Sequence, residues 1–161
     1  MARTTAKPDP ARSAQMAKVR GKDTKPEMRV RKALHAAGLR FRLHAKDLPG
    51  RPDIVFRSRR IAVLVHGCFW HRHADPSCKL ARFPKTRLSF WLNKLEGNRQ
   101  RDARDLASLT ALGWLPIVIW ECQTKDRAAL SALVNLVRSN PPGQTADDST
   151  GSSRTGPALR S

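Results

Sequence analysis

Thirteen consecutive residues, HGCFWHRHADPSC at positions 66–78, combine three histidines, two cysteines and two large aromatic side chains. Within them Cys68, His73 and Cys78 are separated by four residues each, and Cys122 follows an apolar segment later in the chain. Thiolate and imidazole groups are preferred ligands of Zn²⁺, which usually takes four in a tetrahedron. The spacing therefore predicts a structural zinc site made of these four residues. The alternative is a set of buried, unreactive cysteines.

Two further histidines of this segment, His66 and His71, are left over, because a closed four-ligand zinc site has no position for them. Histidine exchanges protons near neutral pH, so both are candidates for acid–base chemistry. The alternative for each is a hydrogen-bonded structural histidine.

A lone carboxylate, Asp53, stands between a turn and an apolar segment in PGRPDIVF. A carboxylate at such a place can hold Mg²⁺ beside a phosphate, because water and the phosphate fill the other positions of the ion. The alternative is that Asp53 caps the turn or pairs with Arg51.

Three aromatic residues accompany these groups. Phe69 and Trp70 lie inside the 66–78 segment, and Trp91 opens the next helical pattern. Aromatic side chains beside a basic cleft can stack on bases or wedge between them. The alternative is ordinary core packing, since Trp is usually well buried.

The charge of the whole chain points to a polyanionic partner. The 161 residues include 31 Lys and Arg against 13 Asp and Glu, a formal net charge of +18 that is concentrated in the first 60 residues. Such an excess is typical of nucleic-acid-binding proteins. The sequence contains no apolar stretch of about 18 residues, so no membrane span is predicted. Residues 1–15 lack the apolar core of a secretory signal. Three cysteines, an odd number, favour a reducing compartment over a disulfide framework.

The elements that must position these groups follow from the apolar patterns. Thr24, Pro26 and Glu27 form a helix start with a capping box, Gly38 is a natural stop, and the apolar stripe consists of Met28, Ala33, Leu34 and Ala37. The expected order begins with a helix over 24–38, strands over 39–43, 53–56 and 61–66, and an irregular loop over 67–88. A helix over 89–112 follows, although Gly97 weakens the helical pattern. A buried strand over 114–121 and a last helix, capped by Thr124 and ending at about Arg138, complete the order. We expect a mixed sheet, with the 53–56 and 61–66 hairpin at its centre and helices on its faces.

The same patterns suggest three parts of the chain. Residues 1–22 are predicted to be a basic, partly flexible arm, and residues 23–138 a single domain. Residues 139–161 are rich in Pro, Gly, Ser and Thr and are predicted to be a disordered tail.

The sequence resembles the very short patch repair (Vsr) DNA mismatch endonucleases over residues 11–138. The resemblance rests on LPGRPDIVF, IAVLVHGCFWHRH, PKTRLSFWLNKLEGNRQRD and GWLPIVIWEC, of which HGCFWH is the most specific. It implies an α/β, restriction-endonuclease-like core with a structural zinc. It also implies Mg²⁺-dependent nicking of duplex DNA on the 5′ side of the T in a T:G mismatch, which arises when 5-methylcytosine deaminates.

The resemblance also implies roles for individual residues. Asp53 matches the metal-binding catalytic aspartate, His71 the histidine that helps activate the attacking water, His66 a second active-site histidine, Glu27 an acidic residue near the site, Asp102 a partner that orients His71, and Phe69, Trp70 and Trp91 aromatics that wedge into DNA. Cys68, His73, Cys78 and Cys122 match the zinc ligands. Val65 would offer a backbone carbonyl to the catalytic metal.

One departure concerns the zinc loop. The interval from His73 to Cys78 is longer than the family leads us to expect, so Asp75 is an alternative ligand to Cys78. The competing functions are a restriction-type or mobile-element nuclease of the same fold, and a zinc-stabilised DNA-binding protein without catalysis. We expect a monomer in a bacterial cytoplasm, functionally linked to a cytosine-5 methyltransferase and to mismatch-repair proteins.

Overall fold

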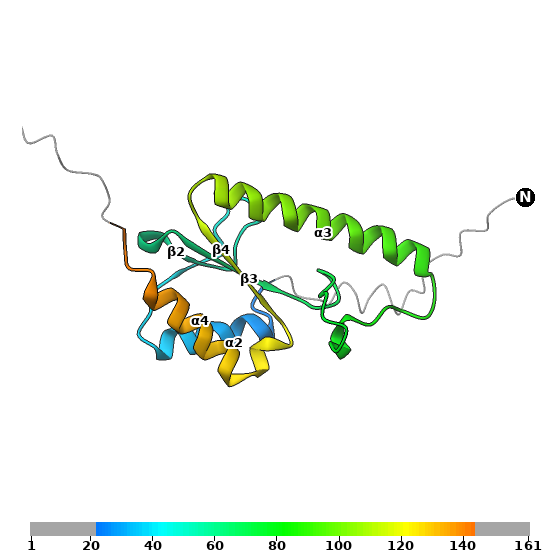
Figure 1. The fold of residues 1–161 in the computed structure, drawn as a ribbon, viewed down its shortest axis with the longest axis horizontal. Coiled ribbons are helices and arrows are strands. Elements are labelled where there is room, and N and C mark those ends of the chain that lie inside the picture. The colour runs from blue at the N-terminus through cyan, green and yellow to red at the C-terminus, as the bar shows by residue number, and fades with distance from the viewer. Residues whose placement is uncertain (1–21, 144–161) are drawn as a thin grey trace, which may run out of the picture.

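The computed structural model describes residues 22–143 in three layers (Figure 1). The predicted arm, apart from Lys22, and the predicted tail from residue 144 onward lie outside the described residues. The elements are α2 (Lys25–Ala36), β1 (Arg42–Leu43), β2 (Ile54–Phe56), β3 (Ile61–His66), α3 (Leu88–Ala111), β4 (Leu115–Trp120) and α4 (Arg127–Ser139), with short 3₁₀ turns at Arg57–Arg59, Lys79–Ala81 and Gln123–Lys125. Helices α2 and α4 cover one face of the sheet and α3 covers the other (Figure 1).

The sheet is mixed, as the sequence predicts. Its strand order is β1-β2-β3-β4, with β1, β2 and β3 antiparallel and β4 parallel to β3. The β2–β3 hairpin is central and pairs Ile54 with Val63, both fully buried. The parallel pairing aligns Ile61 with Leu115 and His66 with Trp120. The ends of β3 and β4 therefore meet at the same edge of the sheet.

Two apolar clusters hold the layers together. One joins α2 and α4 to the sheet and the other joins the C-terminal half of α3 to its opposite face. The first contains Val30, Leu34, Leu39, Ile54, Phe56, Ile61, Val63, Ile119, Leu133 and Val137, and the second Ala45, Leu48, Val55, Ala62, Leu64, Leu109 and Trp114. Alternate residues of β2 and β3 face alternate clusters, as the period of a strand requires. Both faces are buried, which explains why these strands read as continuous apolar runs.

Helix α2 begins as predicted, and of the predicted stripe Leu34 is buried, Ala33 and Ala37 are partly buried and Met28 is exposed. Thr24 is its N-cap and accepts a hydrogen bond from the Glu27 backbone N–H. Met28, expected in the stripe, is 38% exposed, whereas Val30 and Leu34 are fully buried. The side of α2 that faces the sheet is therefore the one that carries Val30 and Leu34, which are four positions apart, and Met28 lies outside it.

Three other predictions need correction. The strand over 39–43 is reduced to two exposed residues, and the backbone turns into the left-handed region at His44 (φ 49°). The last strand is an edge strand in which Ile119 alone is buried, because no further strand pairs with it among the described residues. Asp126, not Thr124, caps α4; Thr124 is buried and its hydroxyl donates to the Glu121 carbonyl.

Helix α3 is long and continuous. It runs through Gly97, where an added Cβ would meet nothing within 4 Å, so this glycine does not mark a break. Its N-terminal half extends beyond the sheet and lies above the irregular loop over 67–87 (Figure 1). Within residues 22–143, no helix combines the length and apolar character needed to span a bilayer.

Candidate active site and metal centre

The ends of β2 and β3 place Asp53 in a cavity of about 540 Å³. Asp53 immediately precedes β2, and its Oδ2 accepts a hydrogen bond of 2.7 Å from the Val65 backbone N–H of β3. The cavity is lined by Thr24, Pro26, Glu27, Gly50, Arg51, Asp53, Leu64, Val65, His66, Gly67, Trp70, His71, Asp102, Asp105 and Glu121. The structure thus brings all five predicted catalytic residues to one cavity.

The electrostatic setting of Asp53 suits a cation. Burial raises the pKa of the Asp53 carboxyl group, the Val65 hydrogen bond lowers it, and the negative charge of Glu27 raises it again. A carboxylate that is penalised by burial and by a like charge is stabilised by a bound cation. With one oxygen held by Val65, the donor set fits Mg²⁺, which needs only one or two protein carboxylates.

The two histidines of the cavity are stacked on each other. The rings of His66 and His71 are 4.0 Å apart and inclined by 11°. His71 Nδ1 lies 2.6 Å from Asp102 Oδ2 of α3, so the ring donates there and its Nε2 is the acceptor when neutral. Burial and the nearby His71 lower the pKa of His66 to about 4, so His66 is neutral near pH 7. This arrangement orients one imidazole to accept a proton beside a second, neutral one.

The parallel register of β3 and β4 gathers the four predicted zinc ligands. His66 of β3 pairs with Trp120 of β4, and Cys68 and Cys122 come two residues after these partners. The Cys122 backbone nitrogen lies 3.4 Å from Cys68 Sγ. Cys122 Sγ lies 3.6 Å from His73 Nδ1. The ligand atoms of Cys68, His73, Cys78 and Cys122 all lie within 4.8 Å of one another. This is a set that could hold one tetrahedral metal ion.

The longer interval between His73 and Cys78 is absorbed by a local turn. Asp75 Oδ1 accepts hydrogen bonds from the backbone N–H and the hydroxyl of Ser77, at 2.8 and 2.7 Å, and the side chain is exposed. Cys78 itself belongs to the four-ligand group. A hydrogen bond with His73 lowers the pKa of the Cys78 thiol to about 7, whereas burial raises the pKa of Cys68. The geometry favours Cys78 over Asp75 as the third loop ligand.

The three predicted DNA-contacting aromatics form one cluster. The ring centroid of Phe69 lies 5.2 Å from Trp70 and 5.4 Å from Trp91, all edge to face. The Lys94 ammonium lies 5.8 Å from the rings of both Trp70 and Trp91. Trp70 also lines the Asp53 cavity, so the aromatic cluster and the cavity are adjacent. All three rings are partly accessible, which excludes a role in the main core.

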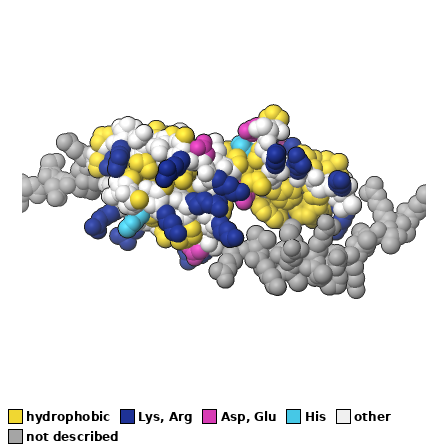
Figure 2. Space-filling model, turned by 90° about the horizontal axis from the view of Figure 1, so that it is seen from below, with side chains coloured by type: hydrophobic (Ala, Val, Ile, Leu, Met, Phe, Trp, Pro, Cys, Tyr) yellow, Lys and Arg dark blue, Asp and Glu magenta, His cyan; other side chains and the backbone are white. Residues whose placement is uncertain are grey.

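The surface around this cluster is unusually apolar. Five large hydrophobic side chains between positions 80 and 92 are at least 37% exposed: Leu80, Phe83, Leu88, Phe90 and Leu92. Figure 2 shows a hydrophobic surface on the half of the molecule that extends beyond the sheet and Lys and Arg side chains on the half formed by α2 and α4. Exposed apolar patches beside charged surfaces mark interaction sites.

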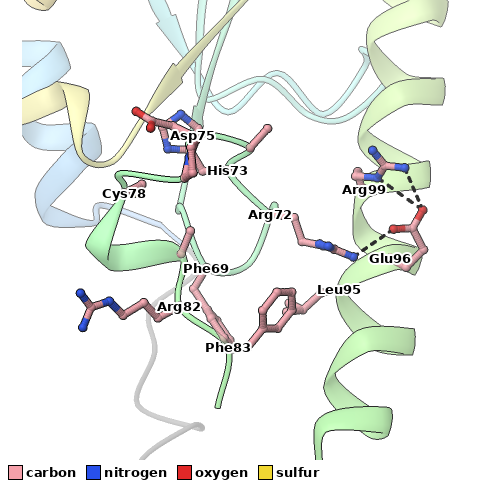
Figure 3. A pocket seen from close by; sticks show the side chains of 13 residues that line it. Phe69, Arg72, His73, Asp75, Cys78, Arg82, Phe83, Leu95, Glu96 and Arg99 are labelled. Carbon is pink, nitrogen blue, oxygen red and sulfur yellow. Dashed lines mark hydrogen bonds and ion pairs between the residues drawn. The ribbon is translucent and has the colours of Figure 1, made fainter. Parts of the chain in front are cut away.

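Polar contacts tie the loop to α3 around a second cavity of about 580 Å³ (Figure 3). The Arg72 guanidinium lies 3.3 Å from Glu96 of α3 and 5.1 Å from the ring of Phe83. Nearby, Asn98 donates to the Trp70 carbonyl at 3.0 Å. These contacts orient the Phe69–Trp70 segment against the helix that carries Trp91.

Sequence reasoning missed residues that complete the site. Arg31 bonds Glu27, a lining residue of the cavity, and contacts His44 behind it, while Phe90 packs on Trp91 at 5.4 Å. Arg31 stands at i+4 from Glu27, a spacing that alone predicts an ion pair on a helix. His44 gave no such signal, because its approach depends on the turn after β1.

A family model described as DNA mismatch endonuclease Vsr matches residues 6–79. The Type II nicking enzyme V.XorIIP of Xanthomonas oryzae pv. oryzae is 54% identical over 117 residues, which make up 73% of this chain and 84% of the relative. The DNA mismatch endonuclease Vsr of Escherichia coli is 42% identical over 120 residues, 74% of this chain and 75% of that protein. The Type II nicking enzyme V.NmeAIP of Neisseria meningitidis is 41% identical over 128 residues, 79% and 89% of the two chains.

Proposed function

Because the chain belongs to the Vsr family of DNA mismatch endonucleases, we propose that it nicks duplex DNA on the 5′ side of the T in a T:G mismatch. One observation carries this proposal: Trp70 is part of both the Asp53 cavity and the partly accessible aromatic cluster. A group that senses a weakened base pair thus lies beside groups suited to phosphodiester hydrolysis. A T:G wobble pair unstacks more easily than a matched pair, which favours a wedge of aromatic rings.

The cavity residues divide the hydrolysis among them. Asp53, together with the Val65 carbonyl, is assigned to Mg²⁺, which supplies positive charge to the phosphate under attack. His71 accepts the proton of the attacking water at Nε2, while Asp102 holds the ring at Nδ1. His66, neutral and stacked on His71, is assigned to act near the scissile phosphate. Glu27 lies in the cavity wall as a second acidic group.

The remaining assignments concern the loop. Cys68, His73, Cys78 and Cys122 hold a structural Zn²⁺, and Phe69, Trp70 and Trp91 enter the DNA beside the mismatch. The core is restriction-endonuclease-like. The net charge of +18 attracts the negatively charged phosphates of the DNA backbone. The proposal includes a monomer in a bacterial cytoplasm, with functional links to a cytosine-5 methyltransferase, whose product deaminates to T, and to mismatch-repair proteins.

The test is strand nicking with Mg²⁺ on end-labelled duplexes that carry one T:G pair in randomised flanks. Duplexes with T:A or C:G at the same position serve as controls, and each strand is labelled in turn. We expect one nick, 5′ to the T, in the mismatched duplex alone, and the flanks of the cut molecules give the recognised sequence.

Other outcomes distinguish the competing functions. Equal cutting of matched and mismatched duplexes, or cleavage of both strands, indicates a restriction-type nuclease. Salt-sensitive binding with no cleavage in any duplex indicates a DNA-binding protein without catalysis.

A further inference from the structure

Arg31 of α2 is a buried cation in the wall behind the Asp53 cavity. Its side chain is 10% exposed, and its guanidinium contacts three groups. Nη1 lies 2.6 Å from Asp23 Oδ1, while Nη2 lies 2.9 Å from Glu27 Oε2 and 3.0 Å from His44 Nε2. Since arginine only donates, His44 Nε2 is the acceptor in this contact.

This arrangement has the form of a cation site that arginine fills. The ligand atoms of Asp23, Glu27 and His44 lie within 4.8 Å of one another, as those of a metal site would. The guanidinium reaches each of them with one of its two terminal nitrogens. Arg31 thus supplies a fixed positive charge to the two carboxylates of this cluster.

Fold stability does not explain this arginine. Burial of an ion pair costs desolvation that its attraction often only offsets. Here Arg31 Nε has no hydrogen-bond partner within the described residues, which adds to that cost. In addition, Asp23 and His44 have positive φ angles of 55° and 49°, a conformation that L side chains adopt at a cost. The cluster holds costly local features together, as functional sites do.

The cluster is connected to Asp53 in two ways. The His44 backbone N–H donates to the Asp53 carbonyl at 3.0 Å, so the residue that accepts from Arg31 also fixes the start of β2. Glu27 and Arg31 act on the Asp53 carboxyl with charges of opposite sign. Glu27 is held by three donors: Arg31, the Asp23 backbone N–H at 3.0 Å and the Thr24 hydroxyl at 3.0 Å.

We propose that Arg31 is a positioning residue that holds Glu27 in the cavity wall and keeps this carboxylate from ligating the cation at Asp53. The inference rests on the proposed function, because it assigns that cation to Asp53. Without Arg31, Glu27 loses its counter-charge and the only charged one of its three donors, so attraction to a cation at Asp53 can draw it away from the two neutral donors that remain. Two carboxylates would then bind Mg²⁺ more tightly than one, in a geometry that misplaces it for hydrolysis.

The experiment compares Arg31→Met and Arg31→Lys with wild type, and uses Arg57→Met as a matched control. Arg57 also pairs with an aspartate, Asp47, at 2.7 Å, but at the surface and outside the cavity. For each protein, the melting temperature is measured with and without Mg²⁺, without DNA. The nicking rate of the T:G duplex is then measured across a Mg²⁺ titration.

For Arg31→Met we expect a larger rise of melting temperature on adding Mg²⁺ and a lower Mg²⁺ concentration for half-maximal rate. The maximal rate should fall roughly 10- to 100-fold, as expected for small misplacement of reacting groups. Arg31→Lys should lie between this variant and wild type, and Arg57→Met should match wild type. Adding Glu27→Gln to Arg31→Met removes the freed carboxylate and should return the Mg²⁺ response to that of wild type.

A Mg²⁺ response of the melting temperature that is the same in Arg31→Met as in wild type would overturn the inference, whatever happens to the rate. Failure of the wild-type protein to nick T:G duplexes would instead count against the proposed function, and the melting temperatures would still decide the role of Arg31.

Discussion

The two parts of the candidate site are held in place by different means. Asp53 and His66 stand at the ends of strands whose residues are almost all buried, and Val65 of one strand bonds the carboxylate of the other. In the loop over 67–87, all of which the structure describes, Cys68 is the only buried residue. The loop nevertheless carries His71 and two of the three clustered aromatics. One part is therefore fixed by hydrophobic packing, whereas the other depends on the cluster of Cys68, His73, Cys78 and Cys122 and on contacts with α3.

This difference explains why the chemistry is divided as it is. A cation-binding carboxylate needs a fixed place, which a buried hairpin provides. Groups that enter DNA must be exposed, and exposed segments have little apolar burial to stabilise them. On the proposed function, the structural metal would supply that missing stability in the loop.

The largest effect on nicking should come from a substitution that disrupts the loop over 67–87 and leaves the sheet intact. Cys122→Ser removes a proposed zinc ligand, and structural zinc contributes several kcal/mol or more to folding. We expect loss of bound zinc, loss of amide protection in residues 67–83 and no detectable nicking, with protection in β2 and β3 retained. Hydrogen exchange measured by mass spectrometry, together with metal analysis, checks this. Unchanged zinc content, or equal loss of protection in the sheet, would contradict the division.

Asp53→Asn should break the sheet-mounted part without changing the fold. We expect nicking to fall by roughly 1,000-fold, since several kcal/mol of charge stabilisation are lost. The melting temperature should not fall, because the amide oxygen still accepts from Val65 and the repulsion with Glu27 disappears. Single-turnover rates and thermal melting test both points, with the exposed Asp47→Asn as control. A variant with the wild-type rate would refute the assignment of Asp53.

Asp102→Asn tests the contact between the two parts, because Asp102 belongs to α3 and His71 to the loop. The amide no longer holds the imidazole in the required tautomer, so we expect the single-turnover rate to fall roughly 100-fold. DNA binding should be unchanged. Asp105→Asn is the control, since Asp105 lines the same cavity from the same helix. An equal loss in both variants would show that the cavity needs negative charge and not an oriented His71.

Trp91→Ala should have the smallest effect on rate and the clearest effect on discrimination. Loss of one stacking ring costs about 1–3 kcal/mol per base, so the preference for T:G over T:A duplexes should fall roughly tenfold or more. Competition between the two duplexes measures this preference. Leu136→Ala, which removes an exposed apolar side chain of α4, is the control. Equal discrimination in wild type and Trp91→Ala would remove the aromatic cluster from mismatch sensing.

Local signals in the sequence predicted the parts of the fold that local physics decides. The start of α2 at Thr24 follows from a capping box. The hairpin of β2 and β3 follows from two β-branched apolar segments that are separated only by the polar RSRR. The parallel position of β4 beside β3 did not follow from any local signal. It depends on which strand edge remains free, and this pairing brings Cys122 to Cys68.

The errors have the same origin. Met28 and Thr124 satisfy helix and cap patterns equally well as Val30 and Asp126, and tertiary packing chooses between them. The burial of Arg31 could not be predicted, because arginine is rarely buried unless partners close around it in three dimensions. His44 is such a partner, supplied by a turn far along the chain.

One uninterrupted helix, α3, carries both Trp91 and Asp102. They are eleven positions apart, close to three full turns, so both side chains leave the same face of the helix about 16 Å apart along its axis. On the proposed function, this rigid spacing sets the offset between the wedged base pair and the phosphate that is cut. The offset is then a property of the protein and stays constant whatever sequence surrounds the mismatch.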